Sequence, residues 1–570
     1  METQRQKFDR RLAALKNERS SFIAHWRDIN EYLLPRRGRF LGAEVNKGDK
    51  RNAKIIDSEA TQAIGILVSG MMSGITSPAR RWFRLGIADK DMMEFGNVKQ
   101  WLNECEDRLY KVFSQSNLYQ MLPYVYEEMA VYGTAAMIQL PDFEELARFQ
   151  VFTIGEYCIA QNERNEVNAV YREVAMTVEQ IVREFGVKKG TKDINWNNIS
   201  QSTKEAWDKG DYDNWVDTVH VIEPNDMRDY NSPLAKDKAF CHKVYEKATG
   251  GKPGDAHKWL LESGWDEFPV YCPRWHLQSP DVYGRSLGMD ALGDVKQLQD
   301  QQKKKGQAIA KMVNPPMVGS SQLKNQRMST LPGDITFVDA TGNQSTGFAP
   351  AYQVQPKLGE FLMDMQDVRE RIRRAFYADL FLMMAQSDRR QITAREIDER
   401  SSEKLLVLGP VMNRLNHMLL NPMIDTTLNR MAEVGFLPPP PEDLQGMGWD
   451  IEYISDMAAA QKAQGILGLQ EAAGFVGNLA TFNPDVIDKF DFDQSVDEYA
   501  NMRGIPAGVV RSDDDVSEIR QAREQQQQQA AMQANMQSAA EGAKTLSDTD
   551  TAGENMLTDI LSGGGLGTRP

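Results

Sequence analysis

The sequence has few cysteines and no long apolar run. Its four cysteines lie far apart among 570 residues and form no Cys-x-x-Cys pair: Cys105, Cys158, Cys241 and Cys272. This spacing is typical of reduced thiols rather than of a disulfide framework. The most apolar segment, residues 63–72, is about half as long as a membrane span of ~20 residues. No apolar run follows the charged residues 1–11, as it would in a secretory signal. We therefore expect no targeting segment and no membrane partner.

Catalytic motifs are missing as well. No G-x-x-x-x-G-K-[ST] phosphate loop occurs. Gly250-Gly251-Lys252 is followed by Pro253, which supplies neither the loop nor the hydroxyl that would hold magnesium. Neither G-x-S-x-G nor H-E-x-x-H is present. These absences argue against a nucleotide-driven motor or a common hydrolase, so we expect no enzyme, no catalytic residue and no cofactor.

Two groups of residues have the chemistry of metal ligands. The first could offer zinc two thiolates and two imidazoles, but without zinc-finger spacing: Cys241, His242, Cys272 and His276. The second lacks the glycine-centred loop of a calcium-binding EF-hand: Asp491, Asp493, Asp497 and Glu498. We interpret the first group as strand residues that face alternate sides, and the second as a solvated acidic face. We therefore expect no metal.

The charge of the chain is strongly uneven. The formal net charge is −15, which excludes a generally basic nucleic-acid coat. Residues 442–510 carry a net −9 and residues 511–570 a net −5, so nearly all of the excess lies near the C-terminus. Only two basic clusters hint at nucleic acid, Lys303–Lys305 and Arg369–Arg374. A charge run is more often a solvated helix face, so each cluster is a weak indication when taken alone.

The first 285 residues have the pattern of an α+β domain. One apolar stripe at helical spacing predicts an N-terminal helix docked on its own domain, since the stripe stops at Pro35: Phe8, Leu12, Leu15, Phe22, Trp26, Ile29 and Leu33. Thr177 and Gln180 form a capping box that opens a helix to Phe185. Residues 162–165 predict a hairpin turn, and 186–215 a polar excursion. Strands are predicted at 149–154, 167–174, 218–222, 239–245 and 269–275.

From Ser286 onward long helices dominate. Residues 286–313 predict a helix of ~42 Å, whose polar middle (297–305) must face solvent or a solvent-filled space. Prolines 315 and 316 end it, and a compact segment, 314–356, follows. A second helix, 357–378, carries the Arg369–Arg374 cluster. Residues 379–392 form a loop with an apolar and a cationic half. A capping box at Thr393 and Glu396 opens a long helix to about residue 434, within a segment 393–441 that ends in four prolines. Residues 442–544 predict an acidic helical region and 545–570 a disordered tail.

Several of these segments, taken in order, resemble the portal proteins of short-tailed bacteriophages, the head-to-tail connector family. The N-terminal matches are WRDINEYLLP (26–35), SGMMSGITSP (69–78) and Trp82-Phe83. The later matches are YGRS (283–286), NPP (314–316), LPGD (331–334), RAFY (374–377) and TARE (393–396). The resemblance covers residues 1 to about 440.

The resemblance implies a predominantly helical α+β subunit of a dodecameric ring at one capsid vertex. Residues 1–285 would be the wing, 286–313 and 357–378 the paired stem helices, and 314–356 the clip. Residues 379–392 would be the tunnel loop, 393–441 the long wing helix with its proline-rich boundary, and 442–544 the crown. The implied partners are further copies of the chain, double-stranded DNA without base reading, terminase, the major capsid protein, scaffolding or internal core proteins, and the tail adaptor. The location would be the virion, and the host cytoplasm during assembly.

Within this framework the candidate site residues form two groups. The tunnel loop contributes Leu380, Phe381, Met383, Met384, Arg389 and Arg390. The stem contributes Lys303, Lys304, Lys305, Arg369 and Arg373. Arginine and lysine side chains there could touch DNA phosphates. For the apolar half of the loop, packing on its own domain is the alternative. For the whole chain, the alternative is another virion structural protein, such as a tail adaptor or an internal head protein.

Overall fold

The computed structural model describes residues 3–35, 37, 53–87, 96–187, 193–247, 258–314, 317–318, 349–350, 358–387, 408–441, 444, 448–503, 510–511 and 513–547. The chain divides into two compact units. The first comprises Met1–Leu85, Glu104–Pro439 and Ile451–Phe490, and the second comprises Gly86–Asn103, Pro440–Asp450 and Asp491–Pro570. Long helices and antiparallel sheets occur together in the first unit, which confirms the predicted α+β class.

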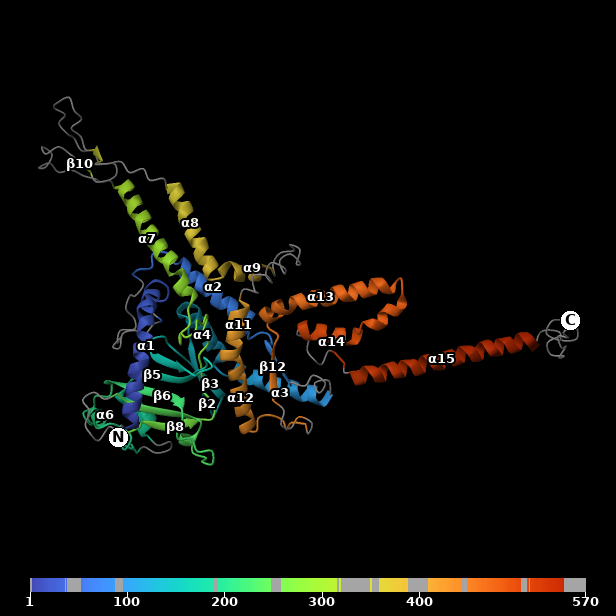
Figure 1. Cartoon of the computed structure of the whole chain (residues 1–570), viewed down its shortest axis with the longest axis horizontal. Coiled ribbons are helices and arrows are strands. Elements are labelled where there is room, and N and C mark those ends of the chain that lie inside the picture. The colour runs from blue at the N-terminus through green and yellow to red at the C-terminus, as the bar shows by residue number, and fades with distance from the viewer. Residues whose placement is uncertain are drawn as a thin grey trace, which may run out of the picture. The chain divides into compact units, whose positions relative to one another are not determined.

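The elements carry the labels of Figure 1. The helices and helical turns are α1 (Gln4–Tyr32), α2 (Glu59–Gly74), α3 (Gly96–Gln115), α4 (Leu118–Tyr132), α5 (Val178–Ile181), η2 (Val182–Gly186), α6 (Gln201–Asp208), η3 (Ala235–Asp237), α7 (Leu287–Val313), α8 (Leu358–Ala375), α9 (Ala378–Ser387), α11 (Gly409–Leu415), η6 (Asn416–Leu420), α12 (Asn421–Glu433), α13 (Asp456–Ala480), η8 (Pro484–Lys489), α14 (Phe492–Arg503) and α15 (Asp513–Ser547). The strands are β1 (Phe83–Ile87), β2 (Ala136–Asp142), β3 (Leu146–Phe152), β4 (Tyr157–Gln161), β5 (Val167–Thr177), β6 (Trp215–Pro224), β7 (Phe240–Glu246), β8 (Leu261–Trp265), β9 (Val270–Tyr271), β10 (Met317–Val318), β11 (Ala349–Pro350) and β12 (Trp449–Tyr453).

A five-stranded antiparallel sheet, in the order β4-β5-β6-β7-β8, forms the centre of the N-terminal part. The turn between β4 and β5 is the one predicted. Asn165 has a φ of 62°, and the Asn162 side chain accepts hydrogen bonds from the backbone N–H groups of Arg164 and Glu166, both at 2.9 Å. Asparagine tolerates the left-handed conformation better than most residues, so this sequence favours a tight turn.

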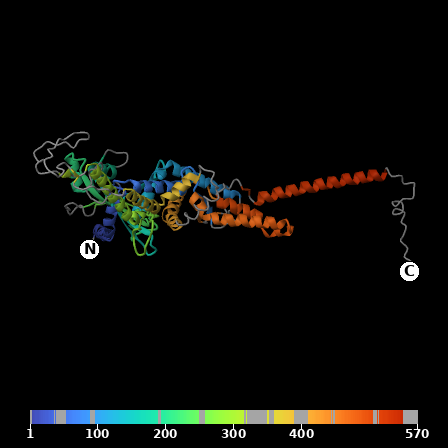
Figure 2. The same cartoon turned by 90° about the horizontal axis from the view of Figure 1, so that it is seen from above.

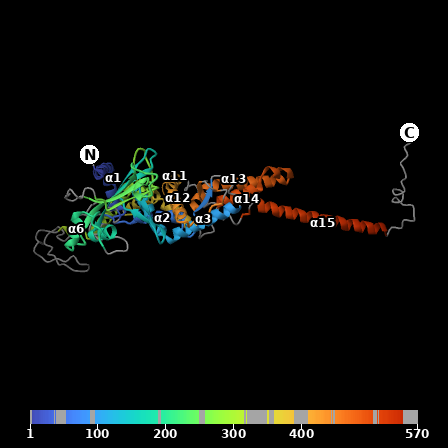
Figure 3. The same cartoon turned by 90° about the horizontal axis from the view of Figure 1, so that it is seen from below.

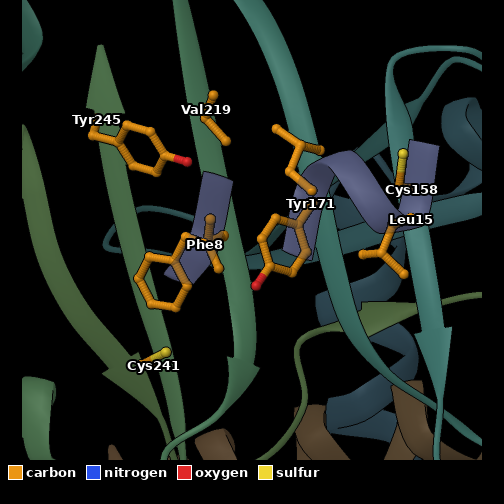
Figure 4. Packing of buried hydrophobic residues seen from close by; sticks show 9 residues of the cluster. Phe8, Leu15, Cys158, Tyr171, Val219, Cys241 and Tyr245 are labelled. Carbon is orange, nitrogen blue, oxygen red and sulfur yellow. The ribbon is translucent and has the colours of Figure 1, made fainter. Parts of the chain in front are cut away.

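Helix α1 packs on one face of this sheet, as the apolar stripe predicts (Figure 4). It begins with a capping box, in which Thr3 and Gln6 bond each other's backbone N–H groups. Phe8, Leu12 and Leu15 are buried against sheet residues that include Tyr171, Val219 and Tyr245. Each buried large apolar side chain stabilises the fold by roughly 1.5–3 kcal/mol. The stripe therefore docks the helix on its own domain.

A helical layer formed by α5, η2 and α6 lies beside the same sheet (Figure 3). The predicted capping box is present, since Thr177 and Gln180 bond each other's backbone N–H groups. The predicted helix to Phe185 continues as the π-helical turn η2. Val178, Ile181 and Val182 are buried together with Val244 of β7. Residues 186–215, expected as a polar excursion, contain the short helix α6.

Adjacent residues of β7 point to opposite faces of the sheet. The Cys241 side chain lies in the apolar cluster between α1 and the sheet. The His242 ring stacks with Trp265 of β8, at a distance of 6.3 Å between ring centroids. The ring centroids of His220 in β6 and His242 are 6.1 Å apart. Burial lowers the pKa of His242 to about 4, and burial together with the charges of His242 and Arg172 lowers that of His220 to about 3. Cys241 and His242 therefore face different environments. Within the described residues no group of three or more His, Cys, Asp or Glu side chains could hold a metal ion.

A second sheet of three strands, β3-β2-β9, contains one departure from expectation. The strand predicted at 269–275 is regular only at Val270–Tyr271. Pro273 follows and has no N–H group to donate, so the ladder is interrupted there. Beyond it, single contacts continue the pairing, with Trp275 N donating to Gly133 O at 2.9 Å. Arg274 is buried and donates to Val282 O at 3.1 Å.

The apolar segment around residues 63–72 is the helix α2, which is longer than that segment and ends before Ser77-Pro78. Ala63, Ile64, Leu67 and Met71 are buried, so the segment is a packing helix, as predicted. No helix within the described ranges is both long and apolar enough to cross a membrane.

The long helix predicted from Thr393 is found in its second half only. Residues 393–407, and with them the proposed Thr393 cap, lie outside the described residues. From Gly409 the chain runs through α11, the π-helical turn η6 and α12 to Glu433, which agrees with the predicted end near residue 434. Most of the compact segment 314–356 also lies outside the described residues. Its described part includes the short pair β10 and β11, in which Met317 is opposite Pro350.

The second unit contains α14 and α15 and the stacked rings of Trp101 and Trp449, whose centroids are 5.2 Å apart. Helices therefore occur in the predicted acidic helical region. Arg520 of α15 donates two hydrogen bonds to Asp493 of α14, at 2.7 and 2.8 Å. Helix α15 is a single extended helix (Figure 2). It includes Thr545–Ser547, which the sequence analysis assigns to the disordered tail. Residues 548–570 lie outside the described residues.

Candidate functional site

The helix α7 forms at the predicted place because its first turn is capped. Ser286 Oγ accepts a hydrogen bond from the backbone N–H of Met289 at 3.0 Å, which satisfies one free donor of the first turn. At Gly288, two residues after Ser286, the helix α7 contacts α4. A Cβ built on Gly288 would lie 2.4 Å from the carbonyl oxygen of Val131. Only glycine allows the two backbones to approach so closely. This contact fixes the position of the start of α7 relative to α4.

The first half of α7 is buried and the second half is exposed. Leu292, Val295 and Leu298 are buried, whereas Met312 and Val313 are 45% and 71% exposed. The predicted stem lysines lie at the start of the exposed half. Lys303 and Lys304 are exposed and Lys305 is half-buried. Lys304 pairs with Asp300 at 2.7 Å. Lys303 and Lys305 make no ion pair within the described residues, so both charges are available to a ligand.

Helix α8 lies alongside α7 (Figure 1). Its buried side chains follow the helical repeat at Met365, Val368 and Ile372. The amide of Gln301 in α7 donates to Asp364 Oδ2 in α8 at 2.5 Å. Like α7, α8 has one end with exposed apolar side chains, since Leu362 is 47% and Met363 76% exposed. The predicted pair of long helices is therefore present.

Two of the candidate stem residues form ion pairs with carboxylates at the start of α2. Arg369 Nη2 lies 2.7 Å from Asp57 Oδ2, and Arg373 Nε lies 2.5 Å from Glu59 Oε1. Arg369 and Arg373 are one helical turn apart, so both guanidinium groups face the start of α2. Both cations are therefore paired with carboxylates of their own domain, and contact of Arg369 and Arg373 with DNA stays a prediction.

Gln299 of α7 completes this junction. Its side-chain oxygen accepts hydrogen bonds from the backbone N–H groups of Ile56 and Asp57, at 2.7 and 2.8 Å, and its amide donates to Asp57 O at 2.9 Å. The segment 56–59 thus bonds both α7 and α8. We name Asp57, Glu59, Gln299, Arg369 and Arg373 the helix-base clamp. The helix-base clamp fixes the buried parts of both helices. It does not contact the exposed parts, which include Met312 and Val313 of α7 and Leu362 and Met363 of α8.

The chain turns sharply between α8 and α9 at Tyr377, which has a φ of 52°. The left-handed conformation costs a non-glycine residue roughly 1–2 kcal/mol. The turn is closed by a hydrogen bond from Leu380 N to Tyr377 O at 3.1 Å. Phe376 and Ala378 on either side are fully buried, and this packing holds the turn in place.

The apolar half of the predicted tunnel loop is a helix that packs inside its own domain. Residues 378–387 form α9, so the interpretation of 379–392 as a loop is wrong for its first part. Leu380 and Phe381 are only 3% and 5% exposed. Phe381 covers Gly70 of α2, where an added Cβ would meet its ring at 2.1 Å. The alternative stated above, packing on the chain's own domain, is therefore correct for these two residues.

The other candidate residues of this segment cannot be placed. The side chains of Met383 and Met384 lie outside the described part of the chain, as do Arg389 and Arg390 entirely. Leu382 is the last residue of α9 with a described side chain, and it is 39% exposed.

Sequence reasoning missed the acidic half of the helix-base clamp. Asp57 and Glu59 lie at the start of α2, where negative charge also interacts favourably with the helix dipole. A signal was present, because Arg369 and Arg373 are spaced to pair on one side with two carboxylates two residues apart. A charge pattern does not say which segments meet, so it could not choose between DNA and these carboxylates.

Comparison with known proteins identifies the family. A family model described as bacteriophage head to tail connecting protein matches residues 5–510. A portal protein of Salmonella phage epsilon15 is 45% identical over 565 residues, which are 99% of this chain and 99% of that protein. A probable portal protein of Bordetella phage BPP-1 is 41% identical over 560 residues, 98% of each chain. A solved chain titled virion of native gene transfer agent (GTA) particle covers 72% of this chain at 10% identity, with a TM-score of 0.31, too low to establish a shared fold. The chain therefore belongs to the bacteriophage head-to-tail connecting protein family.

Proposed function

We propose that this chain is the subunit of a portal ring, through which double-stranded DNA enters and leaves the head of a bacteriophage. The observation that carries the proposal is the match to portal relatives over 98–99% of both chains. A match of this extent favours a portal over a tail adaptor or an internal head protein. It also favours a structural role without enzymatic activity.

In the proposed ring the parts of the chain have distinct tasks. Residues 1–285 form the wing, α7 and α8 the stem, 314–356 the clip, and 442–544 the crown. Terminase and later the tail adaptor bind the clip, and the major capsid protein and internal proteins surround the ring. Twelve copies close the ring, as the resemblance implies. Closed rotational symmetry is consistent with head-to-tail contacts that do not extend into fibres.

The exposed ends of the stem helices support this arrangement. Ile309, Met312 and Val313 of α7 and Leu362 and Met363 of α8 are at least 42% exposed in the single chain. Apolar side chains grouped in this way mark a protein interface rather than a solvated surface. Neighbouring copies would bury them, while Lys303 and Lys305 would contact phosphates without reading bases.

The proposed tunnel segment is now smaller than the one derived from the sequence. Leu380 and Phe381 anchor it on α2, and we propose that Met383, Met384, Arg389 and Arg390 form the part that retains DNA. Replacing Arg389 and Arg390 with alanine should leave assembly intact but give heads that leak DNA. The matched control is Arg183→Ala, which removes a 74% exposed arginine side chain of the wing. Full DNA retention in the double variant would contradict this part of the proposal.

The test of the proposed function is a packaging experiment in infected cells. A phage that lacks this chain should yield heads without DNA, and the wild-type chain supplied from a plasmid should restore filled heads. Filled heads in the absence of the chain would contradict the function. Purified protein should not hydrolyse ATP, and hydrolysis by the isolated chain would contradict the structural role.

A further inference from the structure

The face of the five-stranded sheet opposite α1 carries a row of nitrogen-bearing side chains. Arg172 of β5 is the register partner of His220 of β6. The His220 and His242 rings have centroids 6.1 Å apart, and the His242 and Trp265 rings 6.3 Å. Successive ring planes are tilted by only 33° and 29°. The guanidinium carbon of Arg430 in α12 lies 5.6 Å from the centroid of Trp265. The row therefore crosses the sheet from β5 to β8 and continues to α12.

Four nitrogen atoms of this row are buried and have no hydrogen-bond partner within the described residues: Arg172 Nε, His220 Nε2, Trp265 Nε1 and Arg430 Nη1. Arginine and tryptophan nitrogens can only donate a hydrogen bond, and a histidine nitrogen donates in one of its two tautomers. Leaving a buried donor unpaired costs free energy, so such atoms are usually satisfied by a ligand or a water molecule. What this face lacks is an acceptor.

The positive charge along the row is only partly balanced. Glu156 Oε2 lies 3.3 Å from Arg172 Nη2 and is the one carboxylate within ion-pair distance of the row among the described residues. Arg430 has no ion pair in that part of the chain, and its Nη2 donates to the carbonyl oxygen of Gln139 at 3.3 Å. Burial lowers the pKa of Arg172 and of Arg430, because a charge is costly away from water. A water molecule would satisfy a donor and leave this charge unbalanced, whereas an anion would do both.

We propose that a small inorganic anion, such as chloride, binds between the His220 and His242 rings, beside Arg172. The spacing supports this position, because 6.1 Å is about twice the ~3 Å of an N–H hydrogen bond. One acceptor atom between the two ring edges can therefore lie near both imidazoles. Arg172 contributes its unpaired Nε and its charge, and Arg430 adds charge from the far end of the row. The site stabilises the sheet domain and does not depend on the proposed function.

The first test measures thermal unfolding of the full-length protein as chloride replaces gluconate at constant ionic strength, since screening must not change between samples. The melting temperature of the wild type should rise by roughly 2–4 °C and saturate. His220→Phe keeps a ring of similar size without nitrogen atoms and should lose this rise. The matched control is His417→Phe, which replaces an exposed histidine of η6 and should keep it. Equal responses of the two variants would overturn the proposal.

Two further measurements cover the case in which His220→Phe does not fold. His220→Gln keeps a side-chain N–H donor and should retain part of the chloride response. Crystals of the wild type soaked in bromide should show an anomalous scattering peak between His220 and His242. A melting temperature that rises without saturating indicates an adventitious ion only. That result, or a soaked crystal without the peak, would overturn the proposal and leave ordered water as the partner of these donors.

Discussion

Arg373 Nε and Glu59 Oε1 lie 2.5 Å apart and join the last turn of α8 to the first turn of α2. With Arg369 and Asp57, this pair fixes α8 to the domain that carries it. This contact is consistent with two long helices that extend from a folded domain. It also explains how a cluster with the pattern of a DNA-binding surface can have a structural role.

Removing one side of the helix-base clamp should destabilise the protein. The Asp57 side chain is only 8% exposed, so Arg369→Ala leaves a buried carboxylate without its cation. We expect a loss of about 1–3 kcal/mol in the free energy of unfolding, the usual cost of an unmade charged hydrogen bond. The control is Arg374→Ala in the same helix, whose side chain is 71% exposed. Thermal denaturation of both variants measures the difference, and equal melting temperatures would show that the clamp contributes nothing.

Two glycines of α7 should respond in opposite ways to alanine. Gly288→Ala brings a methyl group to 2.4 Å from the backbone of Val131, so α7 must shift and stability should fall. Gly293→Ala meets no atom within 4 Å and should stabilise the helix by roughly 0.5–1 kcal/mol, because alanine loses less backbone entropy. Chemical denaturation of both variants provides the measurement. A stabilising Gly288→Ala would contradict the described contact of α7 with α4.

The buried histidines His220 and His242 should make the five-stranded sheet domain sensitive to acid. The folded pKa of His242 is lowered to about 4, against an ordinary value near 6.5. Between these values the unfolded state binds a proton that the folded state does not, so stability falls as the pH drops through this window. His242 alone should cost about 2 kcal/mol between pH 7 and pH 5. His242→Phe keeps the stacking on Trp265 and should flatten the decline of the melting temperature, whereas an unchanged slope would show that His242 does not titrate as described.

The C-terminal tail should be dispensable for ring formation. Residues 548–570 are rich in glycine, serine, threonine and aspartate and cannot bury enough apolar surface to offset the entropy of ordering. Because α15 runs to Ser547, the truncation is placed directly after that residue. Truncated protein should form the same particles as the full chain in electron micrographs. Particles that fall apart after truncation would make the tail an assembly element.

The sequence was sufficient to predict those elements whose structure is determined by nearby residues. The α1 stripe, the Thr177 capping box, the turn at Asn165 and the two long helices all depend on periodicity or on one side chain that bonds nearby backbone. The exceptions have local causes too. The strand expected at 269–275 is cut short by Pro273, and the predicted loop after Tyr377 begins as a helix because Leu380 and Phe381 find an apolar surface at Gly70.

The candidate site was harder to predict because it depends on which distant segments meet. Asp57 and Arg369 are separated by 312 residues, and no local pattern records their contact. The lysines at 303–305 were placed correctly on an exposed helix, since polarity alone predicts exposure. Which carboxylates meet a cation depends on the tertiary structure, and at Arg369 and Arg373 the fold brings Asp57 and Glu59 into contact.

Electron microscopy of the purified protein shows whether this chain assembles as a portal subunit. We expect closed rings with a central hole wide enough for duplex DNA, and particle averages with a single rotational symmetry, expected to be twelvefold. Protein that stays monomeric at micromolar concentration, or that assembles into open filaments, would contradict this expectation.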